Sequence, residues 1–94
     1  GMSVLVSSDH DAACEGGDFT RVWCKHRRGS PATFATIERV FGGAVRTQTW
    51  CFRTLVDCAP MDAEVATQLA ASYAERKNIP VVYVEVEDSR RTPA

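Results

Sequence analysis

The clearest pattern of hydrophobic and polar positions lies in residues 60–77, and it is helical. Apolar side chains recur there at every fourth position, which places them on one stripe of a helix: Met61, Val65, Leu69 and Tyr73. Pro60 suits a first helical turn, and Asn78 followed by Pro80 supplies a stop. The pattern predicts a helix over 60–77 whose stripe packs against the core.

Four other segments have the composition of β-strands. They are rich in β-branched and aromatic residues, and they cover residues 4–6, 19–26, 44–56 and 81–86. In the last segment Val82, Val84 and Val86 point one way. Val81, Tyr83 and Glu85 point the other way, so one face of this strand should be buried and the other partly wet.

Residues 30–43 fit two structures. Ser30 and Pro31 form a good helix start, and apolar residues then recur at a spacing of three and four. Several of these residues are β-branched, however, and Gly42-Gly43 is also a two-residue hairpin turn. We expect a short helix over 31–41, with a fifth strand over 32–41 as the alternative.

These elements predict an α+β fold in two layers. One mostly antiparallel sheet of four to five strands should carry one long and one short helix on one face. If the strands that flank the long helix share the sheet in parallel, their connection should be right-handed. We expect one domain over 1–87 and a flexible tail over 88–94.

Composition agrees with a globular chain of one domain. The 94 residues are 45% hydrophobic and 24% charged, which excludes collagen-like, low-complexity and wholly disordered chains. No apolar run reaches the roughly 20 residues of a membrane helix, and the first residues lack a secretory signal. We therefore expect a cytoplasmic protein without a membrane partner.

Charge is distributed unevenly along the chain. Residues 1–18 hold four acids and no Lys or Arg, residues 19–56 hold seven bases and one acid, and residues 57–94 hold seven acids and four bases. We expect these segments to neutralise one another on the folded surface. The alternative is a basic face for nucleic acid in segment 21–53, which includes Lys25, Arg27 and Arg28.

Cysteine and histidine residues raise the question of a metal site. The four cysteines have no C-x-x-C spacing, so we expect reduced thiols. Four residues have the side chains that bind zinc: His10, Cys14, Cys24 and His26. Their spacing does not match a tetrahedral zinc motif, and we expect structural roles and no metal.

Three residues are candidates for catalysis. Asp9 and Asp57 each follow a predicted strand, and together they could hold Mg²⁺ if the two strand ends are neighbours. Cys58 precedes the long helix, where a thiol can become a nucleophile. Each has an ordinary structural alternative as a turn, cap or surface residue. Nucleotide-binding and hydrolase motifs are absent, so we predict no cofactor and leave open whether the protein is an enzyme.

Aromatic residues point to association. Helices on one face of a sheet leave the other uncovered, and the candidates for that second face are Trp23, Trp50, Phe52 and Tyr83. Ordinary core packing is one interpretation, and burial against a second copy is the other. We predict a homodimeric interaction module without chemistry of its own. The alternative is a nucleic-acid-binding or metal-dependent nucleic-acid-processing protein that uses segment 21–53 and Asp9.

Overall fold

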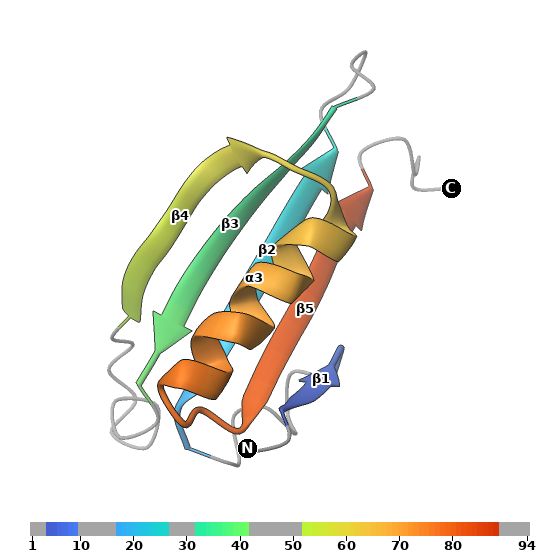
Figure 1. Cartoon of the computed structure of the whole chain (residues 1–94). Coiled ribbons are helices and arrows are strands. Elements are labelled where there is room, and N and C mark those ends of the chain that lie inside the picture. The colour runs from blue at the N-terminus through green and yellow to red at the C-terminus, as the bar shows by residue number, and fades with distance from the viewer. Residues whose placement is uncertain (1–3, 10–16, 27–31, 42–51, 89–94) are drawn as a thin grey trace.

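One helix lies against one face of a five-stranded sheet in the computed structural model of the chain (Figure 1), which describes residues 4–9, 17–26, 32–41 and 52–88. The elements in chain order are β1 (Leu5–Ser7), β2 (Phe19–His26), β3 (Thr33–Val40), β4 (Phe52–Pro60), α3 (Ala63–Arg76) and β5 (Val81–Asp88). The strands are ordered β1-β5-β2-β3-β4. The predicted α+β class in two layers is confirmed.

The sheet is mixed, so the prediction of a mostly antiparallel sheet is wrong. β2 pairs with β3, and β3 with β4, in antiparallel fashion, whereas β5 is parallel to both of its neighbours, β1 and β2. The parallel pairs arise because α3 carries the chain from the edge strand β4 back to β5. In Figure 1 this connection passes in front of the sheet from left to right, and it is the expected right-handed crossover.

The short helix predicted over 31–41 is wrong, because residues 33–40 form strand β3. This strand lies between β2 and β4 and pairs with both. Its β-branched residues lose less side-chain freedom in a sheet than in a helix, and a partner on each edge satisfies its backbone. The described residues therefore hold one helix.

Helix α3 begins at Ala63, three residues later than predicted. Pro60 still belongs to β4, and the amide of Met61 donates to the carbonyl of Thr33 at 3.0 Å. Asp62 is the N-cap, and its carboxylate accepts a hydrogen bond from the Val65 amide at 2.9 Å. At the other end Asn78 has a φ of 57°, the left-handed stop that the sequence predicts.

The buried stripe of α3 is not the one that the sequence predicts. Alanines at 66, 70 and 74 are fully buried, whereas Val65 is 44% exposed and Leu69 is 47% exposed. Alanine methyl groups let the helix backbone approach the sheet closely, and the larger side chains then lie along the flank of the helix. The helix is thus rotated by about one residue from the predicted orientation.

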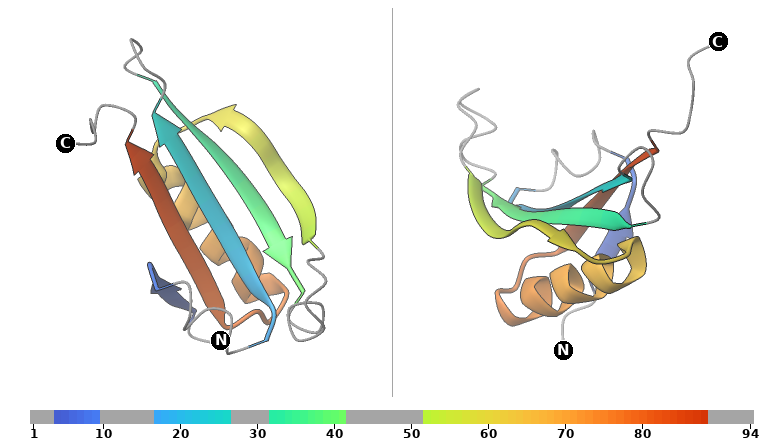
Figure 2. Two further views of the ribbon diagram at one scale, coloured as in Figure 1. Left: turned by 180° about the vertical axis from the view of Figure 1, so that it is seen from behind. Right: turned by 90° about the horizontal axis from the view of Figure 1, so that it is seen from above.

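The two faces of the sheet differ in what they bury, and Figure 2 shows α3 on one side only. We call the side under α3 the helix face and the other the far face. The core on the helix face consists of Val22, Cys24, Ala35, Ile37, Ala66, Ala70, Ala74, Ile79 and Val82. On the far face Phe19, Val40 and Tyr83 form a smaller buried cluster, in which the rings of Phe19 and Tyr83 meet edge to face at 6.5 Å. No helix of the described residues is long and apolar enough to cross a membrane.

Candidate functional site

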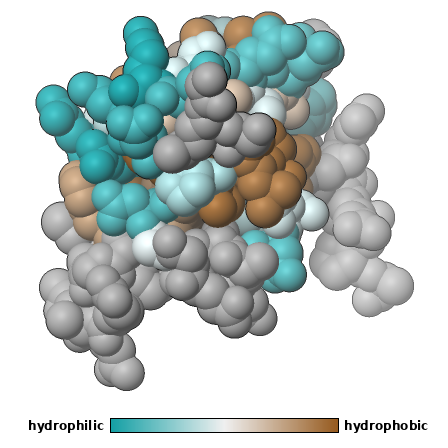
Figure 3. Space-filling view, turned by 60° about the horizontal axis from the view of Figure 1, so that its bottom comes forward, coloured by the Kyte–Doolittle hydropathy of each residue, from teal (hydrophilic) through white to brown (hydrophobic). Residues whose placement is uncertain are grey.

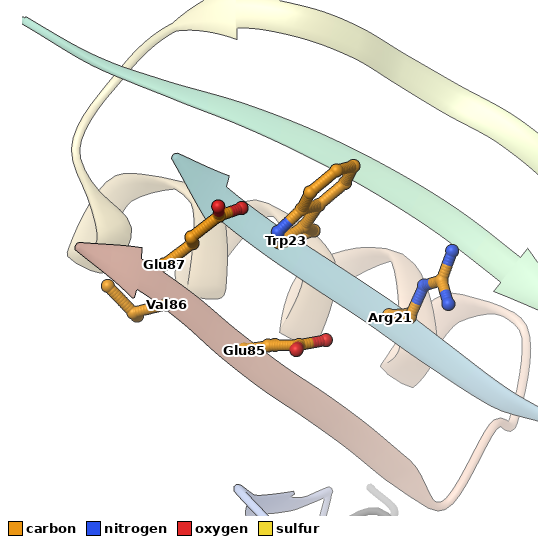
Figure 4. A pocket seen from close by; sticks show the side chains of 5 residues that line it. All are labelled: Arg21, Trp23, Glu85, Val86 and Glu87. Carbon is orange, nitrogen blue, oxygen red and sulfur yellow. The ribbon is translucent and has the colours of Figure 1, made fainter. Parts of the chain in front are cut away.

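Trp23 borders a hollow on the far face, between β2 and β5. The strand alternates, so Val22 and Cys24 point under α3 while Trp23 points away from it and is 38% exposed. The hollow has a volume of about 440 Å³ and is lined by Arg21, Trp23, Glu85, Val86 and Glu87 (Figure 4). The register places Trp23 directly opposite Glu85. We call this feature the Trp23 hollow.

Arg21 is held at one end of this hollow by a buried carboxylate. Its Nε donates to Oε1 of Glu38 at 2.9 Å, and its Nη2 contacts the same oxygen. The two residues are cross-strand partners, and Glu38 is buried. In Figure 4 the guanidinium points toward β3 and away from Glu85. Glu38 therefore neutralises Arg21, and the remaining charges of the hollow, on Glu85 and Glu87, are negative.

A second surface is the groove between α3 and β4. It has a volume of about 170 Å³ and is lined by Ile37, Leu55, Val56, Leu69, Tyr73 and Arg76. Leu69 lies one helical turn after the exposed Val65 on the same stripe, so apolar surface continues along the helix beyond the groove. We call this lining, together with Val65, the α3–β4 groove.

A third apolar area lies at the edge strand β1. Leu5 is 60% exposed and Val6 is 49% exposed. Figure 3 shows apolar side chains gathered at this end of the molecule, bordered by hydrophilic ones. The strand has only three residues, and such shortness is one way in which proteins limit edge-to-edge pairing.

In the described part of segment 19–56, Arg21 and Arg39 are paired with acids. Arg21 pairs with Glu38, and Arg39 donates from Nη2 to a carboxylate oxygen of Asp18 at 3.2 Å. Hydrogen bonds to Asp18 and then to Tyr73 raise the pKa of Arg39, and its guanidinium lies 4.8 Å from the centre of the Phe41 ring. The acidic segment 1–18 thus neutralises part of the basic segment, as we expected. Fewer free cations remain for nucleic acid.

Comparison with protein-family models, curated proteins and solved structures gives no significant match. Functional inference for this chain therefore rests on its own surfaces.

The candidate catalytic residues do not come together. Asp9 follows β1 and Asp57 lies in β4, and these strands are the opposite edges of the sheet with three strands between them. Cys58 is exposed, but it lies within β4 rather than at the start of α3. Its φ is 49°, and its amide donates to Oγ1 of Thr36 at 3.1 Å, as part of an irregular stretch of the strand.

The described part of the chain brings together no group of three possible metal ligands. Cys24 is free and fully buried, and burial, followed by the charge of Asp62, raises the pKa of its thiol. A neutral buried thiol is a poor metal ligand. Cys24 and His26 share a face of β2, as the sequence predicts, whereas His10 and Cys14 lie outside the described residues.

The predicted binding residues have different environments. Trp23, Phe52 and Lys25 are exposed, whereas Tyr83 is buried against Phe19. Trp50, Arg27 and Arg28 lie outside the described residues.

Sequence reasoning missed Arg21, Glu85 and Glu87 as neighbours of Trp23. Only the alternation in the last strand, which puts Glu85 on the wetter face, hinted at them. It also missed Val65 and Leu69 as surface residues, because it assigned both to the core.

Proposed function

We propose that this protein is an association domain that pairs with a second copy of itself through the α3–β4 groove. The observation that supports the proposal is the exposure of Val65 and Leu69, each close to half of its surface, on successive turns of one helix. Fully burying such a side chain contributes about 1.5–3 kcal/mol. A partner that covers the groove would gain part of this free energy of burial at each exposed apolar side chain.

Charge along α3 favours a second copy as the partner. The helix begins with Asp62 and Glu64 and ends with Arg76. A two-fold axis near Leu69 makes the two helices antiparallel, and it places Arg76 of each copy beside Asp62 and Glu64 of the other. Opposite charges then flank an apolar centre, the helix dipoles oppose each other favourably, and the contact closes on itself.

The far face supports a dimer contact less well. Trp23 and Phe52 are exposed there, but Glu85 and Glu87 lie beside Trp23, and a contact that covers them would take two carboxylates out of water where only Glu87 has a cation, Lys25, opposite it in the register. The nucleic-acid alternative is weakened by the ion pairs of Arg21 and Arg39. We place the protein in a reducing compartment such as the cytoplasm, which suits the free thiols of Cys24 and Cys58.

Light scattering at micromolar concentration tests this proposal. We expect about 20 kDa for the wild type, twice the chain mass of 10.3 kDa, and a folded monomer for Leu69→Glu. Gln68→Glu is the matched control, because it adds the same charge at an exposed neighbour that does not line the groove. A wild type of 10.3 kDa throughout, or a Leu69→Glu variant that stays dimeric, would contradict the proposal.

A charge reversal tests the antiparallel arrangement. Arg76→Glu should weaken the dimer because the new carboxylate lies beside Asp62 and Glu64 of the other copy. Adding Glu64→Arg should restore part of the affinity. No recovery in the double variant would exclude this geometry. Salt-sensitive binding of RNA or DNA by the wild type at low salt would instead favour the nucleic-acid alternative.

A further inference from the structure

We propose that the Trp23 hollow binds an organic cation, with the Trp23 indole against its alkyl groups and Glu85 and Glu87 neutralising its charge. This site is separate from the proposed dimer contact, because the hollow and the α3–β4 groove lie on opposite faces of the sheet.

The shape of the hollow and the exposure of Trp23 are the first part of the argument. Both chain neighbours of Trp23 are fully buried, so β2 is firmly packed at this point while Trp23 itself remains 38% exposed. The adjoining volume of about 440 Å³ lies in the usual range of small-molecule sites, roughly 300–1,000 Å³. A firmly held indole beside such a volume is a ready surface for a ligand.

The charges around the hollow are the second part. Arg21 is already neutralised by Glu38, whose side chain is only 8% exposed. Within the described residues neither Glu85 nor Glu87 forms an ion pair. Lys25 lies opposite Glu87 in the register, whereas Glu85 lies opposite Trp23. Glu85 is therefore the carboxylate of the hollow that has no cation opposite it in the register, and the hollow repels phosphate and carboxylate ligands.

The kind of cation follows from these neighbours. Two carboxylates in an open hollow would leave a hard metal ion to take most of its oxygen ligands from water, and such an ion would make no use of the indole. An alkylated ammonium ion is poorly hydrated, and the face of a tryptophan attracts it through the ring quadrupole. Trp23 with Glu85 and Glu87 matches the second kind. The ion could be a free small molecule or a methylated basic side chain of another protein.

Titration of isotope-labelled protein followed by NMR tests the proposal with choline as the probe. We expect saturable shifts of the Trp23 indole signal and of the Glu85 and Glu87 amides, with a dissociation constant in the millimolar range. The neutral isostere 3,3-dimethylbutan-1-ol has the same shape without the charge, and it should bind at least threefold more weakly. Equal binding of the isostere, or shifts confined to other parts of the sheet, would overturn the proposal.

Variants assign the residues. Cation–π attraction at exposed sites is worth a factor of about two to five in affinity, so Trp23→Leu should weaken choline binding by about two- to fivefold. Glu85→Gln should weaken it at least twofold, and Glu75→Gln on the exposed side of α3 should leave it unchanged. If Glu85→Gln binds choline with wild-type affinity, the Trp23 hollow is not the binding site. This variant alone tests the proposal if Trp23→Leu does not fold. Leu69→Glu should bind choline normally, which separates this site from the fate of the dimer.

A second probe identifies the source of the cation. An acetylated and amidated trimethyllysine carries the same ammonium group within a piece of peptide backbone. Binding at least threefold tighter than choline would assign the hollow to a side chain of a partner protein. Equal or weaker binding would assign it to a free small molecule.

Discussion

Trp23 and Cys24 are adjacent in β2, and their environments are opposite. Cys24 is fully buried beneath α3, whereas Trp23 is 38% exposed beside the hollow of the far face. Under the helix the sheet presents small and β-branched apolar residues, because the alanine stripe of α3 leaves little room. Among the residues that the structure describes, no helix lies against the far face, and buried Glu38 of β3 pairs there with Arg21 of the adjacent strand β2. The face that packs against the helix is therefore apolar, whereas on the other face a buried carboxylate needs an ion-pair partner within the sheet.

Filling the space between helix and sheet should have the largest effect. Ala70→Leu adds three carbons where Ala70 is fully buried, and such overpacking should lower the free energy of unfolding by about 2–3 kcal/mol. Urea denaturation followed by circular dichroism measures this change. Glu75→Leu places the same side chain on the exposed side of α3, away from both the alanine stripe and the groove, and it should change stability by less than about 0.5 kcal/mol. Equal losses in both variants would mean that the alanine stripe is not the packed one.

Loss of the Arg21–Glu38 ion pair on the far face should lower the free energy of unfolding by a smaller but measurable amount. Arg21→Gln leaves the buried carboxylate of Glu38 without its cation, which should lower the free energy of unfolding by about 1–2 kcal/mol. Arg53→Gln is the control, since Arg53 is exposed and should stay within about 0.5 kcal/mol of the wild type. A neutral result for Arg21→Gln would show that water reaches Glu38 and that the far face needs no pairing.

How far the sequence predicts these two faces depends on how local each signal is. The strand over 19–26 was predicted with the bounds that the structure has, because its alternation and turn residues are local. The end of the helix at Asn78 is local too. Whether residues 33–40 form a helix or a strand is not a local matter, because pairing with two neighbouring strands decides it. The buried stripe of α3 also depends on a distant surface, since a row of alanines packs well only where a sheet comes close.

The Trp23 hollow depends on tertiary structure even more strongly. Trp23 and Glu85 are 62 positions apart, and only the parallel register between β2 and β5 places them opposite each other. That register exists because α3 returns the chain to the middle of the sheet. From the sequence, Trp23 and Tyr83 look alike as candidates for an exposed face. The packing of Tyr83 against Phe19 separates them, and no local pattern shows that contact.

Leu69→Ala should have a smaller effect on the isolated chain. Complete removal of a buried Leu side chain usually costs about 2–5 kcal/mol, and Leu69 is 47% exposed, so we expect about 1 kcal/mol. Denaturation at concentrations that keep the protein monomeric measures this value. A loss above 2 kcal/mol would place Leu69 in the core, as the sequence pattern predicted, and would remove the basis for the α3–β4 groove.

The smallest effect concerns the thiol of Cys24 at alkaline pH. Burial raises the pKa of this thiol in the folded chain, so the folded protein keeps a proton that the unfolded chain releases. The contribution to stability is therefore fully present below the ordinary thiol pKa of about 8.5, and it is lost as the pH rises through the higher pKa of the folded state. Between pH 8 and 9.5 the free energy of unfolding of the wild type should fall more steeply than that of Cys24→Ala, which has no thiol to titrate there. The small cavity in that variant shifts its whole curve but not its slope, so the readout is the difference in slope between the two denaturation series. Parallel slopes would mean that Cys24 titrates as freely as an exposed thiol and that water reaches the core between α3 and the sheet.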